Sequence, residues 1–282
     1  MQIYNPYEQS TGKVSISKGN QLKMHLDNKW YKADFLGYEG AAEYLSTALL
    51  KQSNIADFVD YQLHKITINE KTFNGCVSKH FLKENEELVT AYRLFLTYKG
   101  ENIDNALKGL SLKEKIGYFV DTMEDITGIS NLGQYLTLML EWDRFVLNEG
   151  RHFNNIAFIL SDNRFRIAPL FDNGAAFLSD TRDDYPLDKN IHGLMTSVCG
   201  KPFSEDFDKQ TDACIELYGT QLKLNKTVSI PESVWDNIRS MYGDKVTERI
   251  HSVLEHQLCN YMEYLTVDIT TQREELTQEP DL

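Results

Sequence analysis

The sequence predicts an α+β fold made of two lobes, and three observations support this class. Residues 1–83 are rich in strand patterns and contain a single helical pattern. Helical periodicity dominates from residue 84 to about 270. A short hairpin pattern interrupts this second part at 156–168. We therefore expect a β-rich N-terminal lobe with one helix over 1–83, a mostly helical C-terminal lobe over 84–270, and a polar tail over 271–282.

The composition limits the classes of partner. The chain has 282 residues, enough for two lobes with a sizeable core. Its net charge of -13 argues against direct binding to nucleic acid or an anionic membrane, although it leaves room for a local basic patch. The sequence has no signal peptide and no long apolar run, so we expect a cytoplasmic protein without membrane contact. Widely spaced cysteines without a Cys-x-x-Cys pair favour reduced thiols: Cys76, Cys199, Cys214 and Cys259.

The N-terminal lobe begins with strand patterns at 13–17, 22–26 and 30–35. A break containing Gly19 separates the first two strands, and Asp27-Asn28-Lys29 is typical of a hairpin turn. The third strand carries Lys32. On these residues alone, a surface hairpin with a solvated lysine is the simplest interpretation, because one glycine in a turn is a weak signal.

The helix of this lobe is predicted over 39–52, where alanine and leucine side chains form an apolar face. It carries Glu43, which is either solvated or paired with Lys32 on the preceding strand. Such a lysine–glutamate pair is one way to orient the phosphates of a nucleotide. Strands follow at 61–68 and 75–81, and the polar run 83–87 marks the boundary between the lobes, where we expect a hinge.

The second lobe is predicted to be helical apart from one hairpin. Its helices are expected at 87–98, 111–126, 131–149, 204–217, 232–242 and 245–265. Ser111-x-x-Glu114 is a capping box, and the helix over 131–149 is apolar on nearly all sides, as a buried central helix would be. Within it, Asp143 either holds the following loop or is a satisfied core carboxylate. Strands at 156–160 and 164–168 form the hairpin around a turn at 161–163, and 175–190 reads as a loop that could cover a cleft.

Two oxygen-bearing residues lie at the ends of this hairpin, Asn155 before it and Asp172 after it. An amide oxygen and a carboxylate suit a magnesium ion that bridges nucleotide phosphates. Arg151 can neutralise a phosphate or pair with an acid, whereas His152 most simply braces the loop through a backbone hydrogen bond. Gly150 lies five residues before Asn155, where a phosphotransferase of this type would carry a catalytic carboxylate.

These motifs resemble those of the HipA-like serine/threonine kinases. Arg151-His152-x-x-Asn155 is similar to the family's catalytic loop, Asp-Arg-His-x-x-Asn, and Pro169-Leu170-Phe171-Asp172-Asn173-Gly174 is similar to its magnesium-binding segment. More weakly, Gly19-Asn20-Gln21-Leu22-Lys23 resembles the loop over the ATP phosphates. The resemblance runs from about residue 13 to 260. It implies a bilobal protein-kinase-like fold in the compact form of the family, without an additional N-terminal subdomain.

The resemblance also implies a set of functional residues. ATP and Mg²⁺ would lie between the lobes, with Asn155 and Asp172 as metal ligands and residues 76–82 as the hinge. Gly150, Arg151 and His152 would form the catalytic loop. The implied cofactor-binding residues are Gly19, Gln21, Lys23, Lys32, Glu43 and Lys79. Ser15 and Ser17 would be candidates for an inhibitory autophosphorylation.

One departure from the family separates the possible functions. The family's catalytic aspartate is Gly150 here, and glycine can neither accept a proton nor orient a hydroxyl. Glu149 is adjacent, but neighbouring side chains in a loop point in different directions. The change is either natural, as in a pseudokinase, or an inactivating substitution in a toxic kinase.

Three hypotheses about function follow. The first is an ATP- and Mg²⁺-dependent serine/threonine protein kinase of the toxin type with impaired or absent activity. For this kinase, the family implies a protein substrate in translation and an antitoxin or repressor partner. The second is a non-catalytic nucleotide-binding module that regulates a protein partner. The third is a lipid or small-molecule kinase, which the net charge and the lack of membrane-seeking segments disfavour.

Overall fold

A four-stranded antiparallel sheet with strand order β1-β2-β6-β3 forms the first part of the structure. The computed structural model describes residues 21–68 and 70–267. The predicted strand at 13–17, with Ser15 and Ser17, as well as Gly19 and the tail over 271–282, lies outside the described residues. The elements of this part are β1 (Lys23–Leu26), β2 (Lys29–Ala33), α1 (Glu39–Leu50), β3 (Tyr61–Leu63), β4 (Ile66–Ile68), β5 (Lys71–Phe73) and β6 (Gly75–Lys79). Asp27 and Asn28 adopt positive φ angles of 50° and 59° in the β1–β2 turn, a conformation that Asp and Asn tolerate best after glycine.

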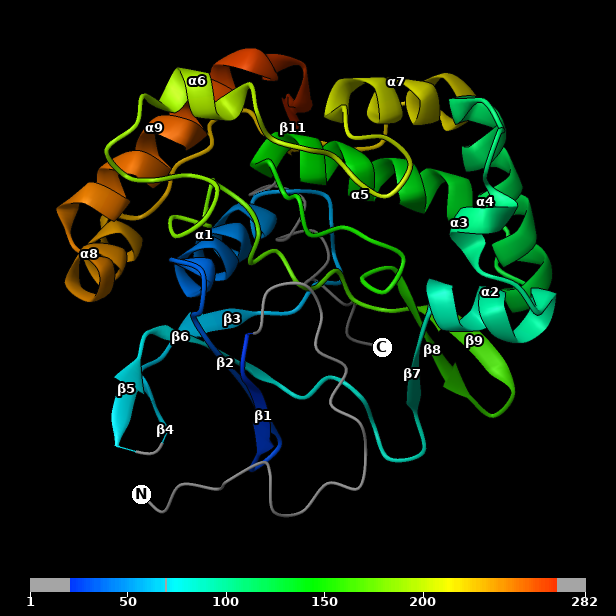
Figure 1. Cartoon of the computed structure of the whole chain (residues 1–282), viewed down its shortest axis with the longest axis horizontal. Helices are drawn as coiled ribbons and strands as arrows, with labels where there is room; N and C mark the ends of the chain where they lie inside the picture. The colour runs from blue at the N-terminus through cyan, green and yellow to red at the C-terminus, as the bar shows by residue number, and fades with distance from the viewer. Residues whose placement is uncertain (1–20, 69, 268–282) are drawn as a thin grey trace, which may run out of the picture.

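Helix α1 lies between this sheet and the helices of the second part (Figure 1). Two glycines allow the close approach. A Cβ atom on Gly75 would lie 2.1 Å from the Lys32 carbonyl oxygen, and one on Gly40 would lie 2.6 Å from the Gly75 carbonyl carbon. Because neither residue has a side chain, the first turn of α1 can rest directly on β6. This contact brings Glu43 on α1 next to Lys32 on β2.

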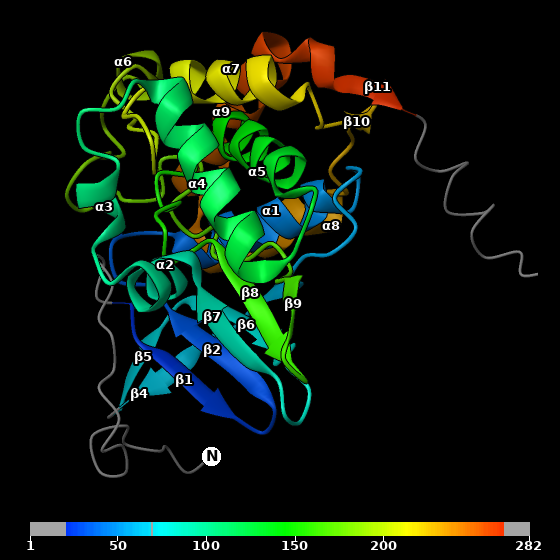
Figure 2. The ribbon, with the colours of Figure 1, turned by 90° about the vertical axis from the view of Figure 1, so that its right-hand side faces the viewer.

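The second part is mostly helical, and its helices stand above β1 to β6 in the perpendicular view (Figure 2). Its elements are β7 (Glu87–Thr90), α2 (Ala91–Lys99), α3 (Ile103–Ala106), α4 (Leu112–Thr127), α5 (Leu132–Val146), β8 (Ala157–Ser161), β9 (Arg164–Ile167), α6 (Ile191–Met195), α7 (Phe207–Tyr218), β10 (Leu224–Asn225), α8 (Glu232–Tyr242), α9 (Asp244–Asn260), a 3₁₀ turn (Met262–Tyr264) and β11 (Leu265–Val267). Helix α5 is buried along almost its whole length, as its apolar sequence predicts. The α+β class is therefore confirmed.

The hairpin β8–β9 and the capping box of α4 agree with the sequence predictions. Phe158 pairs with Ile167, and Asp162 and Asn163 form the turn at positive φ. The Ser111 side chain accepts a hydrogen bond from the Glu114 backbone, and the Glu114 carboxylate accepts one from Ser111 N. These features depend on neighbouring residues, so the local sequence determines them.

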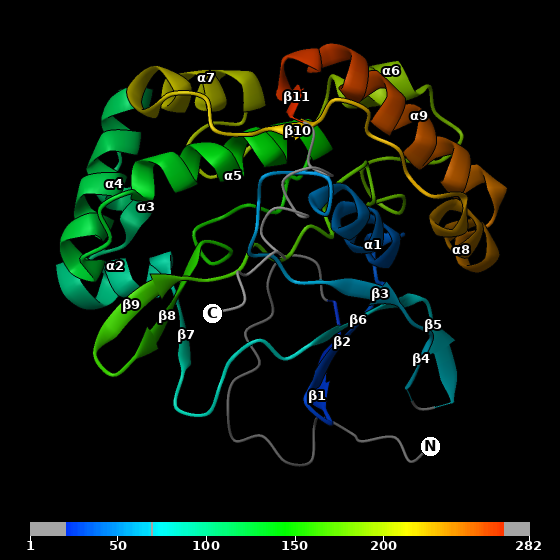
Figure 3. The same cartoon turned by 180° about the vertical axis from the view of Figure 1, so that it is seen from behind.

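The predicted helix over 87–98 is wrong in its first turn. Residues Glu87–Thr90 form β7, which pairs with β8 and extends the hairpin to a three-stranded sheet next to α2 (Figure 3). The Thr90 side chain then caps α2 by accepting a hydrogen bond from Arg93 N. The β-branched Val89 and the good cap Thr90 favour this arrangement, but the strand exists only because the distant β8 presents an edge to it.

Other element boundaries also differ from the predictions. The predicted strand over 61–68 is two strands, because β3 pairs with β6 whereas β4 pairs with β5. The predicted helix over 131–149 ends at Val146, because Leu147 adopts a left-handed conformation (φ 56°) and Asn148 N bonds back to Asp143 O. The helix predicted over 245–265 ends at Asn260. The sequence patterns did not predict α3, α6 or β5, which are all short.

The end of α8 fixes the start of α1 against the sheet. Asp34, which directly follows β2, accepts hydrogen bonds from Gly40 N (2.7 Å) and from the Tyr242 hydroxyl (2.7 Å). Asn74 donates to the Met241 carbonyl at 2.9 Å. Since α1 carries Glu43, these contacts connect the C-terminal helices with the position of Glu43. No helix of the described residues is both long and apolar enough to cross a membrane.

We expect Asp34 to make the protein less stable as the pH rises towards 8. Burial, helped by the charge of Glu39, raises the pKa of Asp34 from 3.8 to about 7. The unfolded chain releases this proton near pH 4 and the folded chain only near pH 7. The free energy of unfolding therefore falls across this window, by roughly 2–4 kcal/mol. In Asp34→Asn this decrease should be missing, and urea titrations of both proteins from pH 4.5 to 8.5 measure it. Parallel pH profiles for the two proteins would contradict the assignment.

Candidate functional site

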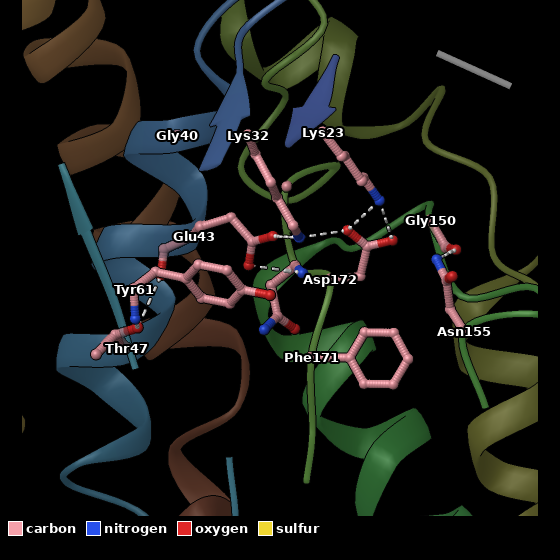
Figure 4. A network of polar contacts seen from close by, with 12 residues as sticks. Lys23, Lys32, Gly40, Glu43, Thr47, Tyr61, Gly150, Asn155, Phe171 and Asp172 are labelled. Carbon is pink, nitrogen blue, oxygen red and sulfur yellow. Dashed lines mark hydrogen bonds and ion pairs between the residues drawn. The ribbon is translucent and has the colours of Figure 1, made fainter. Parts of the chain in front are cut away.

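The candidate site is centred on Lys32, whose ammonium group lies between two carboxylates (Figure 4). Lys32 Nζ is 2.6 Å from Glu43 Oε1 and 2.7 Å from Asp172 Oδ1. Burial alone would lower the pKa of Lys32, but Asp172 and Glu43 outweigh it and raise this pKa well above its ordinary value. Lys32 is therefore charged. The two alternatives for Glu43 are decided in favour of the ion pair.

Lys23 approaches the same carboxylate from the neighbouring strand. Its Nζ is 3.5 Å from both Asp172 oxygens. The register pairs Lys23 with Lys32, so both side chains leave the same face of the sheet. Burial would raise the pKa of Asp172, but Lys32, Lys23 and Arg151 together hold it well below its ordinary value. Asp172 is thus a permanent anion between two cations, and it adopts a positive φ of 63° that places its side chain there.

Asn155 precedes the β8–β9 hairpin and Asp172 follows it, and Asn155 lies on the far side of Asp172 from Glu43 in Figure 4. The Asn155 amide nitrogen donates to the Gly150 carbonyl at 2.8 Å, which leaves the amide oxygen as the atom able to hold a cation. No cluster of three His, Cys, Asp or Glu side chains suited to a metal occurs among residues 21–68 and 70–267. The donor set nevertheless fits Mg²⁺ that receives further oxygen ligands from phosphates and water.

The position of Arg151 tests the alternatives that the sequence left open for Arg151 and Asp143. Its guanidinium forms a bidentate pair with Asp143, with Nε–Oδ2 at 2.8 Å and Nη2–Oδ1 at 3.1 Å, and both side chains are 0% exposed. Arg151 Nη1 also donates to the carbonyls of Asn155 (3.0 Å) and Phe171 (2.8 Å). Arg151 therefore pairs with an acid and braces the loops that carry Asn155 and Asp172. Asp143 holds the loop through Arg151 and Asn148, and because it is buried and hydrogen-bonded it is also a satisfied core carboxylate, so both interpretations apply.

The network continues through a residue to which the sequence analysis gave no role. Asn173 Oδ1 accepts hydrogen bonds from Trp142 Nε1 (3.1 Å) and Arg151 Nη2 (3.3 Å), while Asn173 N donates to Glu43 Oε2 at 2.9 Å. Asn173 thus connects the buried Arg151 cluster with the Lys32–Glu43 pair. Its place directly after Asp172 was the only signal in the sequence.

Glu149 does not place its carboxylate at position 150, where the resemblance to the HipA-like kinases leads us to expect one. The Glu149 side chain accepts hydrogen bonds from the Tyr185 hydroxyl (2.6 Å) and Cys199 N (2.7 Å). Burial raises the pKa of Glu149. Its carboxylate therefore accepts hydrogen bonds from the loop over 175–190 and from the segment after α6.

Three further residues that the sequence analysis assigned to the site, His152, Gln21 and Lys79, lie in different environments. His152 is half-buried, and its Nδ1 has no hydrogen-bond partner among the described residues. The Gln21 amide nitrogen is likewise buried and unpaired within the described part of the chain. Lys79 pairs in register with Lys29, on the face of the sheet opposite Lys32, and is exposed. The structure therefore does not bring Lys79 to the site. Residues 76–82 comprise most of β6 and the start of the connection to β7.

The comparisons with known proteins identify a fold. No protein-family model matches the chain, and no curated protein matches it. The crystal structure of a Helicobacter pylori proinflammatory kinase, CtkA, superimposes with a TM-score of 0.57 at 19% identity, covering 97% of this chain and 96% of that chain. A complex of the Shewanella oneidensis MR-1 toxin–antitoxin proteins HipA and HipB with operator DNA gives 0.43 at 10% identity, over 92% of this chain and 68% of that chain. On the first likeness, the chain has the kinase-like fold that its resemblance to the HipA-like kinases predicts.

Proposed function

We propose that this protein is a HipA-like serine/threonine kinase scaffold that binds Mg²⁺·ATP and whose phosphotransfer is impaired or absent because of Gly150. The observation that supports this proposal most is the chain of contacts Lys23–Asp172–Lys32–Glu43 beside Asn155. Phosphoryl transfer needs held cations and a positioned metal more than covalent help from the protein. Lys23 and Lys32 would supply the cations, and Asp172 with Asn155 would position the metal. Buried partners hold these side chains.

In this proposal, each side chain has a defined role. Asp172 and Asn155 would hold the metal through their side-chain oxygens, and Lys32, oriented by Glu43, would contact nucleotide phosphates. Bound Mg²⁺ supplies Lewis-acid stabilisation of charge on the phosphate oxygens. Arg151 keeps the two metal-ligand loops at a fixed separation through the Asn155 and Phe171 carbonyls. Nothing at position 150 orients an attacking hydroxyl or accepts its proton.

The sequence resemblance extends the proposal to partners. A Ser/Thr-containing protein would be the substrate, and an antitoxin or repressor would be the partner, in the cytoplasm. A second candidate function is a nucleotide-binding regulator without catalysis. It is favoured by one observation, namely that the Glu149 carboxylate is bonded to Tyr185 and Cys199.

Calorimetric titration with Mg²⁺·ATP tests the proposed site. We expect the native chain to bind and Lys32→Met to weaken binding by about tenfold or more, because a charge-assisted contact to phosphate is lost. Lys29→Met is the matched control, since Lys29 lies on the same strand but is exposed on the opposite face. Asp172→Asn should also weaken binding when Mg²⁺ is present. No binding by the folded native chain would refute the proposal, as would equal losses in the Lys29 and Lys32 variants.

A further inference from the structure

Lys201 brings a lysine to the catalytic loop from a distant part of the chain. It lies between α6 and α7, and its Nζ donates a hydrogen bond to the Glu149 carbonyl oxygen at 2.8 Å. The next carbonyl along the chain, that of Gly150, accepts from the Asn155 amide nitrogen at 2.8 Å. The ammonium group and the Asn155 amide thus bind successive carbonyls, which places them within roughly 10 Å of each other.

The segment that carries Lys201 is fixed on both sides of this residue. Cys199 N donates to the Glu149 carboxylate at 2.7 Å, and Gly200 N donates to the Glu205 carbonyl at 2.6 Å. The Lys201 carbonyl accepts from Gln210 Nε2 at 2.9 Å. The backbone at Lys201 is therefore ordered before any ligand binds, and a contact from its side chain costs less conformational entropy.

Burial raises the pKa of Glu149 and the charge of Lys201 lowers it, but the two side chains do not form an ion pair. In the part of the chain that the structure describes, no carboxylate oxygen lies within the 4.0 Å ion-pair distance of Lys201 Nζ. Lys201 is exposed, and within the described residues its Nζ is bonded to a neutral carbonyl, which an anion can replace.

Lys201 complements the two lysines of the sheet. Lys23 and Lys32 reach Asp172 from β1 and β2, whereas Lys201 comes from the helical part of the chain and meets the loop at the Glu149 carbonyl. Charge on a transferring phosphoryl group is spread over its terminal oxygens, so cations on several sides stabilise it best. We propose that Lys201 is a phosphate-binding residue of this site and contacts the terminal phosphate of the bound nucleoside triphosphate. This inference rests on the proposed nucleotide-binding function.

The test compares Mg²⁺·ATP with Mg²⁺·ADP, which lacks the terminal phosphate. Calorimetry on the full chain should show that Lys201→Met weakens Mg²⁺·ATP binding by about tenfold and Mg²⁺·ADP binding by less than about twofold. Lys201→Arg should retain most of the preference, because it keeps the charge. Lys209→Met is the matched control, since Lys209 lies on the nearby helix α7 and is paired with Asp206. It should leave both affinities unchanged.

The outcomes separate the two proposals. If the native chain binds both nucleotides and Lys201→Met weakens both equally, or neither, the role of Lys201 is refuted while the proposed function stands. If the folded native chain binds neither nucleotide, both proposals fall. A thermal melt of each variant accompanies the titrations, and a Lys201→Gln variant replaces Lys201→Met if the latter does not fold.

Discussion

Gly150→Asp should raise phosphotransfer by about 100-fold or more, the largest gain expected from any single substitution in this chain. An aspartate at this position would add the carboxylate that can orient a hydroxyl and accept its proton. The space around Gly150 is nearly large enough for a Cβ atom. A Cβ atom on Gly150 would lie 3.2 Å from Ala175 Cβ and 3.2 Å from Asn148 Oδ1, so these neighbours must yield by a few tenths of an ångström.

Radiolabel transfer from [γ-³²P]ATP measures this gain, with autophosphorylation and ATP hydrolysis as readouts. Gly150→Asn is the matched control, because asparagine has nearly the same shape but is no base. Phosphotransfer by the Asp variant alone would identify an inactivated kinase. Mg²⁺·ATP binding by both variants without transfer would contradict this expectation and favour the regulatory module. Mapping of phosphorylated residues would also test Ser15 and Ser17.

Arg151→Met should destabilise the protein by about 3–5 kcal/mol, because it leaves the Asp143 carboxylate buried without its counterion. It also removes the donors to the Asn155 and Phe171 carbonyls. Guanidinium denaturation at neutral pH measures the effect as a change in the free energy of unfolding. Arg93→Met provides the comparison, since Arg93 pairs with Glu87 where both side chains are mostly exposed (67% and 57%). That pair should contribute at most about 1 kcal/mol.

A double variant separates the lost ion pair from a loss of packing. If the unpaired carboxylate causes the instability, Arg151→Met combined with Asp143→Leu should recover part of the lost stability. A loss below about 1 kcal/mol in Arg151→Met would show that the buried pair does not hold these loops. Because Arg151 braces both proposed metal ligands, the single variant should also bind Mg²⁺·ATP less tightly than the native chain.

Local sequence predicted the features that need only neighbouring residues. Three such features are the turn at Asp162-Asn163, the Ser111 capping box and the apolar residues on nearly all sides of α5. Each is encoded within a short segment, and the structure has all three. Strand β7 failed this kind of prediction. Its residues are compatible with the start of a helix, and pairing with β8 decided the outcome.

The sequence by itself predicted the two-part α+β architecture and indicated Lys32, Glu43, Asn155 and Asp172 as candidates for a nucleotide site. Only the tertiary structure decided which of them meet. It placed Lys32 between Glu43 and Asp172, turned Lys79 to the opposite face, buried Arg151 on Asp143, and brought Lys201 to the carbonyl before Gly150. The physical reason is that a motif fixes residue types and short-range backbone geometry. Burial, charge pairing and the approach of distant segments follow from how α1, α5 and the segment before α7 pack together.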